Sequence, residues 1–312
     1  MNPQHLDPQS PAKKERAHRH PKRPAGFQRK TVFQHPLLYK SFIRYSELKG
    51  LRPGTIAFYE DKLTRFFRWL KKRPIDEVNV DDFKAHLLQQ GNSPVTVNIY
   101  LRAVRAMVNW AASNGLIQIF PIRMMREPRT LPRILSLADV QRVIDVARRG
   151  TLTRARDVAI LWVLIDLGLR PGELVNLQLQ DLDFAGNCLR AEGKTGERLL
   201  IFSQNTRKAL LAYLRVRRAL PGEECLFADR LGQSMTYRAL RQRLRELGRR
   251  AGLVKCFPYL FRHTSATEHL RAGADLFTLR AFMGHSHLET TRRYIHTNLG
   301  DIARMQQKSS PA

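Results

Sequence analysis

The chain has 312 residues, with 54 Lys and Arg against 27 Asp and Glu, so its formal net charge of +27 favours a polyanion such as nucleic acid as partner. Its longest apolar run, Val158 to Leu169, contains Asp166 and is too short to cross a bilayer, and the first thirty residues lack the apolar core of a secretory signal. The three widely separated cysteines show neither a disulfide framework nor zinc spacing, which predicts a protein of the reducing cytoplasm.

Residues 1–32 hold five prolines and eight Lys or Arg against two acidic residues, a composition typical of a disordered basic tail. The simplest interpretation is a solvated tail. The alternative is an arm that lies along DNA phosphates.

Residues 33–114 predict a bundle of helices with basic outer faces. Apolar residues at helical spacing place the helices at residues 36–49, 53–70, 80–90 and from Pro94 onward, with Ser93 as the cap of the last one. The outward basic residues are candidates for contact with DNA phosphates: Lys62, Arg65, Arg68, Arg102 and Arg105.

A linker is predicted over residues 115–135, because this stretch contains three prolines and no sustained period. Ser136 then caps a helix, and a nearly all-apolar helix over residues 157–167 is expected to be the buried centre of a second domain. Arg170 follows the end of that helix. Taken alone, Arg170 is best explained as the partner of Glu173 in a turn.

Two short strands, 188–191 and 198–202, are predicted to flank a tight connection that contains Lys194. Helices are expected over residues 204–219 and 236–251. The second helix carries arginines at every fourth position, which repel one another unless they face a polyanion, so they are further candidates for DNA contact: Arg241, Arg245 and Arg249.

The stretch from Tyr259 to His296 contains two apolar-periodic runs that end at Gly273 and Gly284, and a third helix is expected to start near His287. This arrangement can bring together an arginine, a histidine and a tyrosine: Arg262, His285 and Tyr294. Arginine binds phosphate oxygens with a planar fork, and tyrosine can act as a covalent nucleophile. The combination therefore favours phosphate chemistry.

The same stretch resembles the active site of the tyrosine recombinases, which include phage integrases and Xer-type recombinases. The resemblance rests on Arg262-His263, on Gly284-His285-Ser286 and on Tyr294, nine residues after His285. It extends to the segment G-L-R-P-G-E-L, which contains Arg170 and Glu173, and to the hairpin lysine, Lys194. Tyr259 stands where the family usually has a histidine.

The resemblance implies a mainly α fold with a small β-hairpin or sheet in the catalytic domain. A four-helix, SAM-like core-binding domain (33–114) would be followed by the linker (115–135), a catalytic domain (136–300) and a C-terminal tail (301–312). Tyr294 would be the nucleophile, Arg170 and Arg262 would bind the phosphate, and Glu173 would orient Arg170. Lys194 would protonate the leaving oxygen, His285 would hydrogen-bond the phosphate, and Tyr259 would replace the usual histidine.

The resemblance further implies double-stranded DNA as substrate, four protomers on paired sites, and in some systems a second recombinase or an accessory protein. No metal, ATP or other cofactor is expected. The activity would be DNA cleavage and rejoining in integration, excision, transposition or resolution of a mobile element or replicon. The alternatives are a DNA-binding regulator without catalysis, a noncatalytic RNA-binding protein, and a metal-dependent nuclease with His285, His287 and His296 as ligands.

Overall fold

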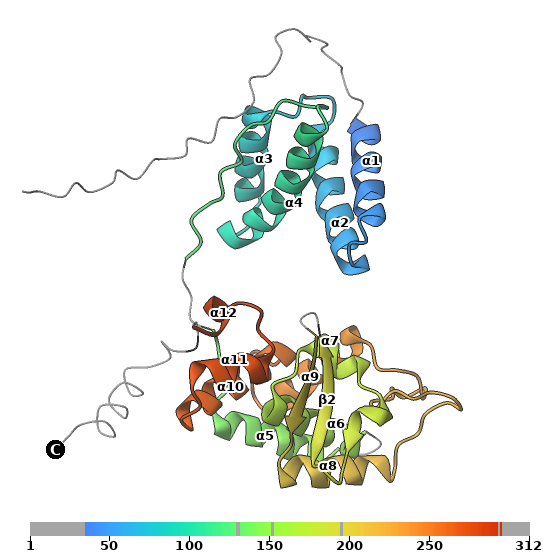
Figure 1. Ribbon diagram of the computed structural model, residues 1–312. Helices are drawn as coiled ribbons and strands as arrows, with labels where there is room; N and C mark the ends of the chain where they lie inside the picture. The colour runs from blue at the N-terminus through green and yellow to red at the C-terminus, as the bar shows by residue number, and fades with distance from the viewer. Residues whose placement is uncertain (1–34, 129–131, 151–152, 194–195, 293, 295–312) are drawn as a thin grey trace, which may run out of the picture. The chain divides into compact units, whose positions relative to one another are not determined.

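The computed structural model describes residues 35–128, 132–150, 153–193, 196–292 and 294 (Figure 1). The chain divides into two compact units between Pro128 and Arg129, and each unit has its own apolar core. The fold is mainly α with one small sheet, as predicted. Within the described ranges, no helix has the length and apolar character needed to cross a bilayer. The predicted tails, 1–32 and 301–312, lie outside these ranges.

Within residues 35–128, the described part of the first unit, there are four helices, as predicted: α1 (His35–Leu48), α2 (Pro53–Leu70), α3 (Glu77–Gln89) and α4 (Pro94–Ser113). Local signals explain where they begin. The Ser93 side chain accepts a hydrogen bond from the backbone N–H of Thr96 at the start of α4, and Asp76 does the same for Asn79 in α3. The apolar faces of the four helices enclose aromatic pairs such as Phe66 and Phe83, whose ring centroids are 5.1 Å apart.

Most of the predicted linker belongs to the first unit. Ile122 is buried in its core, and the Asn98 side chain pairs with the backbone of Met125, donating to its carbonyl at 2.9 Å and accepting from its N–H at 2.8 Å. The segment from Gly115 to Pro128 therefore packs on α4 although it is not helical. The linker was predicted because this stretch lacks a helical period. A non-helical segment can still bury apolar residues, and no such period reveals them.

The second unit is built around α6 (Arg154–Leu167), the helix predicted to be buried. Val163, Leu164 and Leu167 have no exposed surface, and α6 packs against α5 (Leu137–Arg148), α8 (Gln204–Leu214) and α10 (Pro258–Arg271). Ser136 and Asp139 form a capping box at the start of α5, so the predicted cap is confirmed. The remaining helices of this unit are α7 (Pro171–Asn176), α9 (Tyr237–Arg250), α11 (Leu276–Met283) and α12 (Leu288–Arg292).

The sheet has three antiparallel strands in the order β1 (Leu182–Asp183), β2 (Cys188–Gly193) and β3 (Gly196–Ile201), preceded by a 3-10 turn, η1 (Leu179–Asp181). The register runs from Cys188 opposite Ile201 to Gly193 opposite Gly196. The strands are therefore longer toward the tip than predicted, and β1 is an additional strand. Lys194 lies between β2 and β3 and outside the described residues.

The helix predicted over residues 204–219 is too long, because α8 ends at Leu214. Beyond it the chain turns back, and the Arg217 guanidinium donates to the carbonyls of Glu223 at 2.8 Å and Cys225 at 2.5 Å. These contacts hold the loop that precedes α9. They connect residues outside the helix, so the helical period of the sequence gives no sign of them.

Candidate active site

The site lies where α6 ends. Gly168 closes α6 in the left-handed conformation, with φ 56°, and Arg170 is the residue that precedes α7. A Cβ atom on residue 168 would lie 2.9 Å from Ser265 Oγ and 3.0 Å from Met283 Sδ. Glycine is therefore needed both for the turn and for the close approach of α10 and α11.

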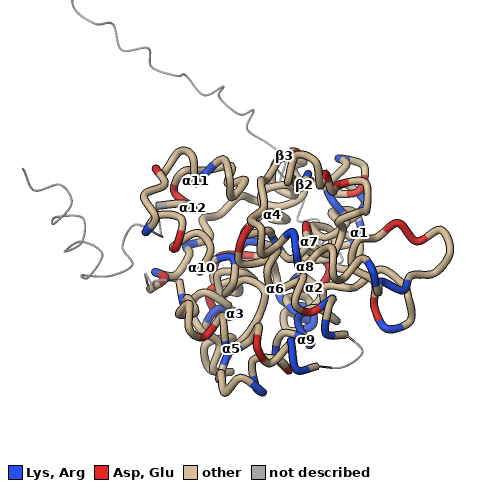
Figure 2. The backbone as a smooth tube through the Cα atoms, turned by 90° about the horizontal axis from the view of Figure 1, so that it is seen from below, with Lys and Arg blue, Asp and Glu red and all other residues tan. Residues whose placement is uncertain are grey.

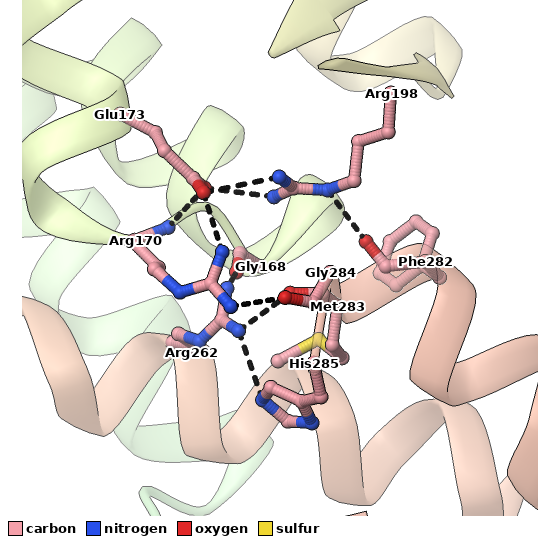
Figure 3. A network of polar contacts seen from close by, with 9 residues as sticks. All are labelled: Gly168, Arg170, Glu173, Arg198, Arg262, Phe282, Met283, Gly284 and His285. Carbon is pink, nitrogen blue, oxygen red and sulfur yellow. Dashed lines mark hydrogen bonds and ion pairs between the residues drawn. The ribbon is translucent and has the colours of Figure 1, made fainter. Parts of the chain in front are cut away.

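Glu173 is the centre of a polar network (Figure 3). Its carboxylate accepts from the backbone N–H of Arg170 at 2.9 Å and from Arg170 Nη1 at 2.6 Å. Burial alone would raise the pKa of this carboxyl group. The hydrogen bonds from Arg198 and Arg170 outweigh burial and hold the pKa below its ordinary value, so Glu173 is ionised at neutral pH.

Arg198, on β3, grips the same carboxylate from the other side. Its Nη1 and Nη2 atoms donate to the two oxygens of Glu173 at 3.0 and 2.7 Å, and its Nε donates to the carbonyl of Phe282 at 2.9 Å. One side chain thus connects the hairpin to the end of α11 and, through Glu173, to Arg170 (Figure 3). A two-point arginine–carboxylate pair fixes orientation as well as distance.

Arg262, on α10, is buried beneath the network. Its Nη1 donates to the carbonyl of Gly168 at 2.5 Å and its Nη2 to the carbonyl of Met283 at 2.6 Å. Burial, and next the positive charge of Arg170, lower the pKa of Arg262 to about 10, so the guanidinium is still charged at neutral pH. Two positive side chains therefore lie close together, an arrangement suited to one multiply charged anion.

His285 follows Gly284, which ends α11 in the left-handed conformation with φ 62°. Its Nε2 lies 3.0 Å from Arg262 Nη2, and its Nδ1 lies 2.9 Å from Thr291 Oγ1. Because a guanidinium can only donate, Nε2 is the acceptor, and Nδ1 carries the proton. Arg170 Nη2 also donates to the carbonyl of Gly284, so the turn before His285 is held by the first arginine.

Tyr294 is almost fully buried, with 1% of its surface exposed. Its ring is nearly parallel to that of His285, with an interplanar angle of 7° and 6.2 Å between centroids. Its hydroxyl oxygen lies 2.8 Å from Nδ1 of His263, on α10. The four predicted residues Arg170, Arg262, His285 and Tyr294 are thus brought together, although more than 120 positions separate the first from the last.

A pocket of about 550 Å³ opens beside this network. Its lining includes Arg198, Arg280, Gly284 and His285, from β3, α11 and the turn that follows. Arg280 supports that turn by donating to the carbonyls of His285 at 3.1 Å and Ser286 at 3.0 Å. Two arginines and one glutamate, Glu197, contribute the charged groups of the lining, so its formal charge is positive.

The remaining candidates differ in their positions. Tyr259 lies on α10 with 43% of its surface exposed, and its ring centroid is 6.4 Å from that of His263. Lys194 lies outside the described residues, but its chain neighbour Gly193 packs so closely that a Cβ atom there would clash with the carboxylate of Glu173. In the part of the chain that the structure describes, no group of three His, Cys, Asp or Glu side chains could hold a metal ion.

The candidate DNA-contact residues fall into two groups. Arg241, Arg245 and Arg249 are exposed along α9, and basic residues recur along this helix in Figure 2. In the first unit, Arg68 is exposed, while the others also have internal partners: Lys62 pairs with Asp61, Arg65 with the Tyr100 hydroxyl, Arg102 with Glu127 and Arg105 with the Ile122 carbonyl. Arg102 and Arg105 thus help to hold the segment that follows α4.

Two residues of the site were not assigned a role from the sequence. Arg198 follows the hairpin glycines as one of many arginines, and nothing local marks it as the partner of Glu173. His263 directly follows Arg262 and lies one helical turn after Tyr259 on α10. This spacing is the signal in the sequence that could have marked His263 as a residue of the site.

Two protein-family profiles match the sequence, one in each unit of the chain. The phage integrase family profile matches residues 133–300, and the profile of the phage integrase N-terminal SAM-like domain matches residues 38–118. The chain belongs to the phage integrase family. The resemblance seen in the sequence to tyrosine recombinases is thereby confirmed.

The chain is similar over most of its length to Xer recombinases. It is 30% identical to tyrosine recombinase XerC of Thermodesulfovibrio yellowstonii, over 87% of this chain and 95% of the relative. It is 32% identical to tyrosine recombinase XerD of Pseudomonas putida, over 90% and 99% of the two chains. Among solved structures, the integrase of transposon Tn1549 in complex with transposon right-end DNA has the same fold, with a TM-score of 0.74 and 20% identity over 90% of this chain and 100% of that one.

Proposed function

We propose that this protein is a site-specific recombinase that cuts and rejoins DNA through a 3′-phosphotyrosyl link on Tyr294. Membership of the phage integrase family supports site-specific recombination as its activity. The observation that carries the chemical proposal is the convergence of Arg170, Arg262 and His285, with the ring of Tyr294 stacked on that of His285. A phosphodiester bound by the two arginines would lie close to a tyrosine hydroxyl.

The arginines would act on the charge of the transition state. Attack on phosphorus gives a pentacoordinate state in which negative charge accumulates on the non-bridging oxygens, and positive groups fixed in advance stabilise that charge. Arg170 is fixed by Glu173, and Arg262 by the carbonyls of Gly168 and Met283. Because the arginines stabilise the negative charge, this scheme does not require a metal ion. Because the phosphotyrosyl bond conserves the energy of the phosphodiester, it does not require ATP.

His285 would contact the same phosphate. In the arrangement described, its Nε2 accepts a hydrogen bond from Arg262. To donate to a phosphate oxygen, Nε2 must carry a proton, and the N–H of Arg262 must turn from the ring toward the phosphate. When DNA binds, the hydrogen bond between Arg262 and His285 is therefore expected to break, and each of the two side chains then donates to the phosphate.

Lys194 is proposed as the acid that protonates the leaving 5′ oxygen. The support is its place in the chain, directly after Gly193, which lies against Glu173 in the arginine network. The hairpin is tied to this network by Arg198. A lysine side chain has a flexible stem and an ammonium group that can donate a proton, as the leaving oxygen requires.

Double-stranded DNA is the proposed substrate, and the structural relative bound to transposon-end DNA supports it. The net charge of +27 and the exposed arginines on α9 provide the attraction to phosphates. We further propose that four protomers act on paired sites, in some cases with a second recombinase or an accessory protein. The biological setting proposed is integration, excision, transposition or resolution of a mobile element or replicon.

The test uses a nicked duplex taken from sequence that flanks the gene, incubated with the protein in excess EDTA. The nick releases a short strand after cleavage and so traps the covalent intermediate. A denaturing gel is expected to show a protein–DNA adduct with wild-type protein and none with Tyr294→Phe. If wild-type protein binds this DNA and forms no adduct, the chain is a DNA-binding regulator without catalysis. An adduct that forms only without EDTA would indicate a metal-dependent nuclease.

A further inference from the structure

The hydroxyl of Tyr294 contacts the imidazole of His263, a residue to which the sequence motif assigns no role. His263 Nδ1 lies 2.8 Å from Tyr294 Oη, and the ring centroids are 5.7 Å apart. The ring of His285 lies against Tyr294 as well, but its two nitrogens contact Arg262 and Thr291. Of these two imidazoles, His263 is the one in hydrogen-bond contact with the oxygen that would attack phosphorus.

The attacking oxygen needs a proton acceptor. A free phenol has a pKa of about 10, so a tyrosine at neutral pH holds its proton until a base removes it. Histidine, with an ordinary pKa of about 6.5, is largely neutral at pH 7 and can take that proton. The phenol of Tyr259 cannot do so, and its side chain is exposed to solvent.

The position of His263 fits this role. It lies four residues after Tyr259 on α10, so both side chains project from the same face of the helix. Position 259 has no basic side chain, but His263, one helical turn further along α10, can act as the base. It already contacts Tyr294 Oη.

We propose that His263 accepts the proton of Tyr294 during strand cleavage, an assignment that rests on the function proposed above. As Oη bonds to phosphorus, its proton moves to Nδ1, the bond from phosphorus to the 5′ oxygen breaks, and that oxygen takes a proton from Lys194. In rejoining, the 5′ hydroxyl oxygen bonds to phosphorus and gives its proton back to Lys194, the phosphotyrosyl bond breaks, and Nδ1 returns its proton to Oη. The step needs no other reactant.

The experiment compares His263→Asn with His263→Ala in single-turnover cleavage of the nicked duplex. The asparagine amide lies near the position of Nδ1, so it can hydrogen-bond Oη but cannot take up a proton. Both variants are expected to cleave about 10²-fold or more slowly than wild type, which is the range of general base catalysis. His263→Gln is a second non-basic variant. Equal affinity for the duplex and an unchanged melting temperature show that a variant is folded.

A second substrate separates this role from that of the acid. It carries sulfur in place of the leaving 5′ oxygen, and a thiolate leaves without being protonated. Lys194→Ala is expected to recover on this substrate, whereas His263→Asn stays slow, because the proton on Oη must still be removed.

Three outcomes would overturn the assignment. Cleavage by folded His263→Asn at the wild-type rate would mean that the histidine only positions Tyr294 through a hydrogen bond. Recovery of His263→Ala on the sulfur substrate would place the histidine on the leaving-group side. If wild-type protein binds the duplex and forms no adduct, the proposed function is wrong, and the role of His263 is wrong with it. The first two outcomes contradict the role of His263 alone and do not affect the proposed recombinase function.

Discussion

A single carboxylate, that of Glu173, holds two arginines of the network in place. Glu173 has 4% of its side chain exposed and accepts hydrogen bonds from Arg170 and Arg198. Removing one partner of a buried charge cluster leaves the other charges uncompensated, and this costs more than the pair itself contributes. The free energy of unfolding and the geometry of Arg170 therefore both depend on this residue.

We expect Glu173→Gln to lower the free energy of unfolding of the second unit by about 3 kcal/mol at neutral pH. The folded pKa of Glu173 lies below its ordinary value of 4.5, so its stabilising charge is fully present above about pH 4.5 and is lost as the pH falls through the folded pKa. The difference between wild type and variant should shrink in acid. Urea unfolding followed by Trp162 fluorescence, with Trp69 and Trp110 replaced by Phe, measures it. A difference that is constant with pH would contradict the prediction.

Tyr259 gives a second prediction at this scale. Replacing it with histidine adds an imidazole beside His263, on the face of α10 that leads to Tyr294. We expect Tyr259→His to cleave at least as fast as wild type from neutral to alkaline pH, because it adds a second imidazole, which is a base near neutrality where phenol is not. Cleavage rates measured across neutral and alkaline pH test this. A slower rate with unchanged DNA affinity would show the expectation to be wrong.

Among the elements, the hairpin of β2 and β3 is tied to the site by Arg198. Arg198→Ala removes two hydrogen bonds to Glu173 and one to the Phe282 carbonyl. We expect a loss of about 10²-fold in the cleavage rate with little change in DNA affinity, because a small displacement of catalytic groups has effects of this size. Arg190→Ala is the matched control, since Arg190 is exposed on β2. Equal activity of the two variants would contradict the positioning role.

Helix α9 presents its exposed arginines on one side and buries Leu240, Leu244 and Leu247 on the other. Like charges at this spacing destabilise a helix slightly in isolation, so a polyanion nearby is the expected compensation. The buried face is held in part by Arg243, which pairs with Asp157 at 2.7 Å and with Glu246 at 2.7 Å. Arg243 thus has a structural role that distinguishes it from its exposed neighbours.

If the exposed face of α9 binds DNA phosphates, the triple variant Arg241→Gln, Arg245→Gln and Arg249→Gln should reduce DNA affinity on all sequences. The slope of log affinity against log salt should become smaller by about 3, one for each lost phosphate contact. Filter binding or anisotropy over a salt series measures it. A triple variant of Arg142 and Arg148 on α5 and of Arg149, which caps its C-terminal end, removes the same charge elsewhere. An equal change there would show an effect of net charge only.

On the scale of the whole molecule, every described residue of the candidate active site belongs to the second unit. The first unit contributes its own core and basic residues, several of which also support the segment from Gly115 to Pro128. Because the described residues of the candidate active site lie in the second unit, substitutions in the first unit are expected to act on DNA affinity rather than on the cleavage step.

Local signals in the amino-acid sequence were enough to predict most helices and to single out four residues that the fold brings together. Caps such as Ser93 and Ser136, glycines such as Gly168 and Gly284, and the helical period act over a few residues, so they can be recognised without knowledge of the fold. The order and spacing of the arginines, the histidine and the tyrosine also identified the family.

The contacts that arrange the site could not be inferred in this way. Arg198 and Phe282 are 84 positions apart, Arg170 and Gly284 are 114 apart, and His263 and Tyr294 are 31 apart. Such pairs form only when helices α6, α10 and α11 pack together, and packing depends on side-chain volumes summed over the whole core rather than on any local pattern. The sequence thus determined which chemical groups are present, and the tertiary packing determined which of them touch.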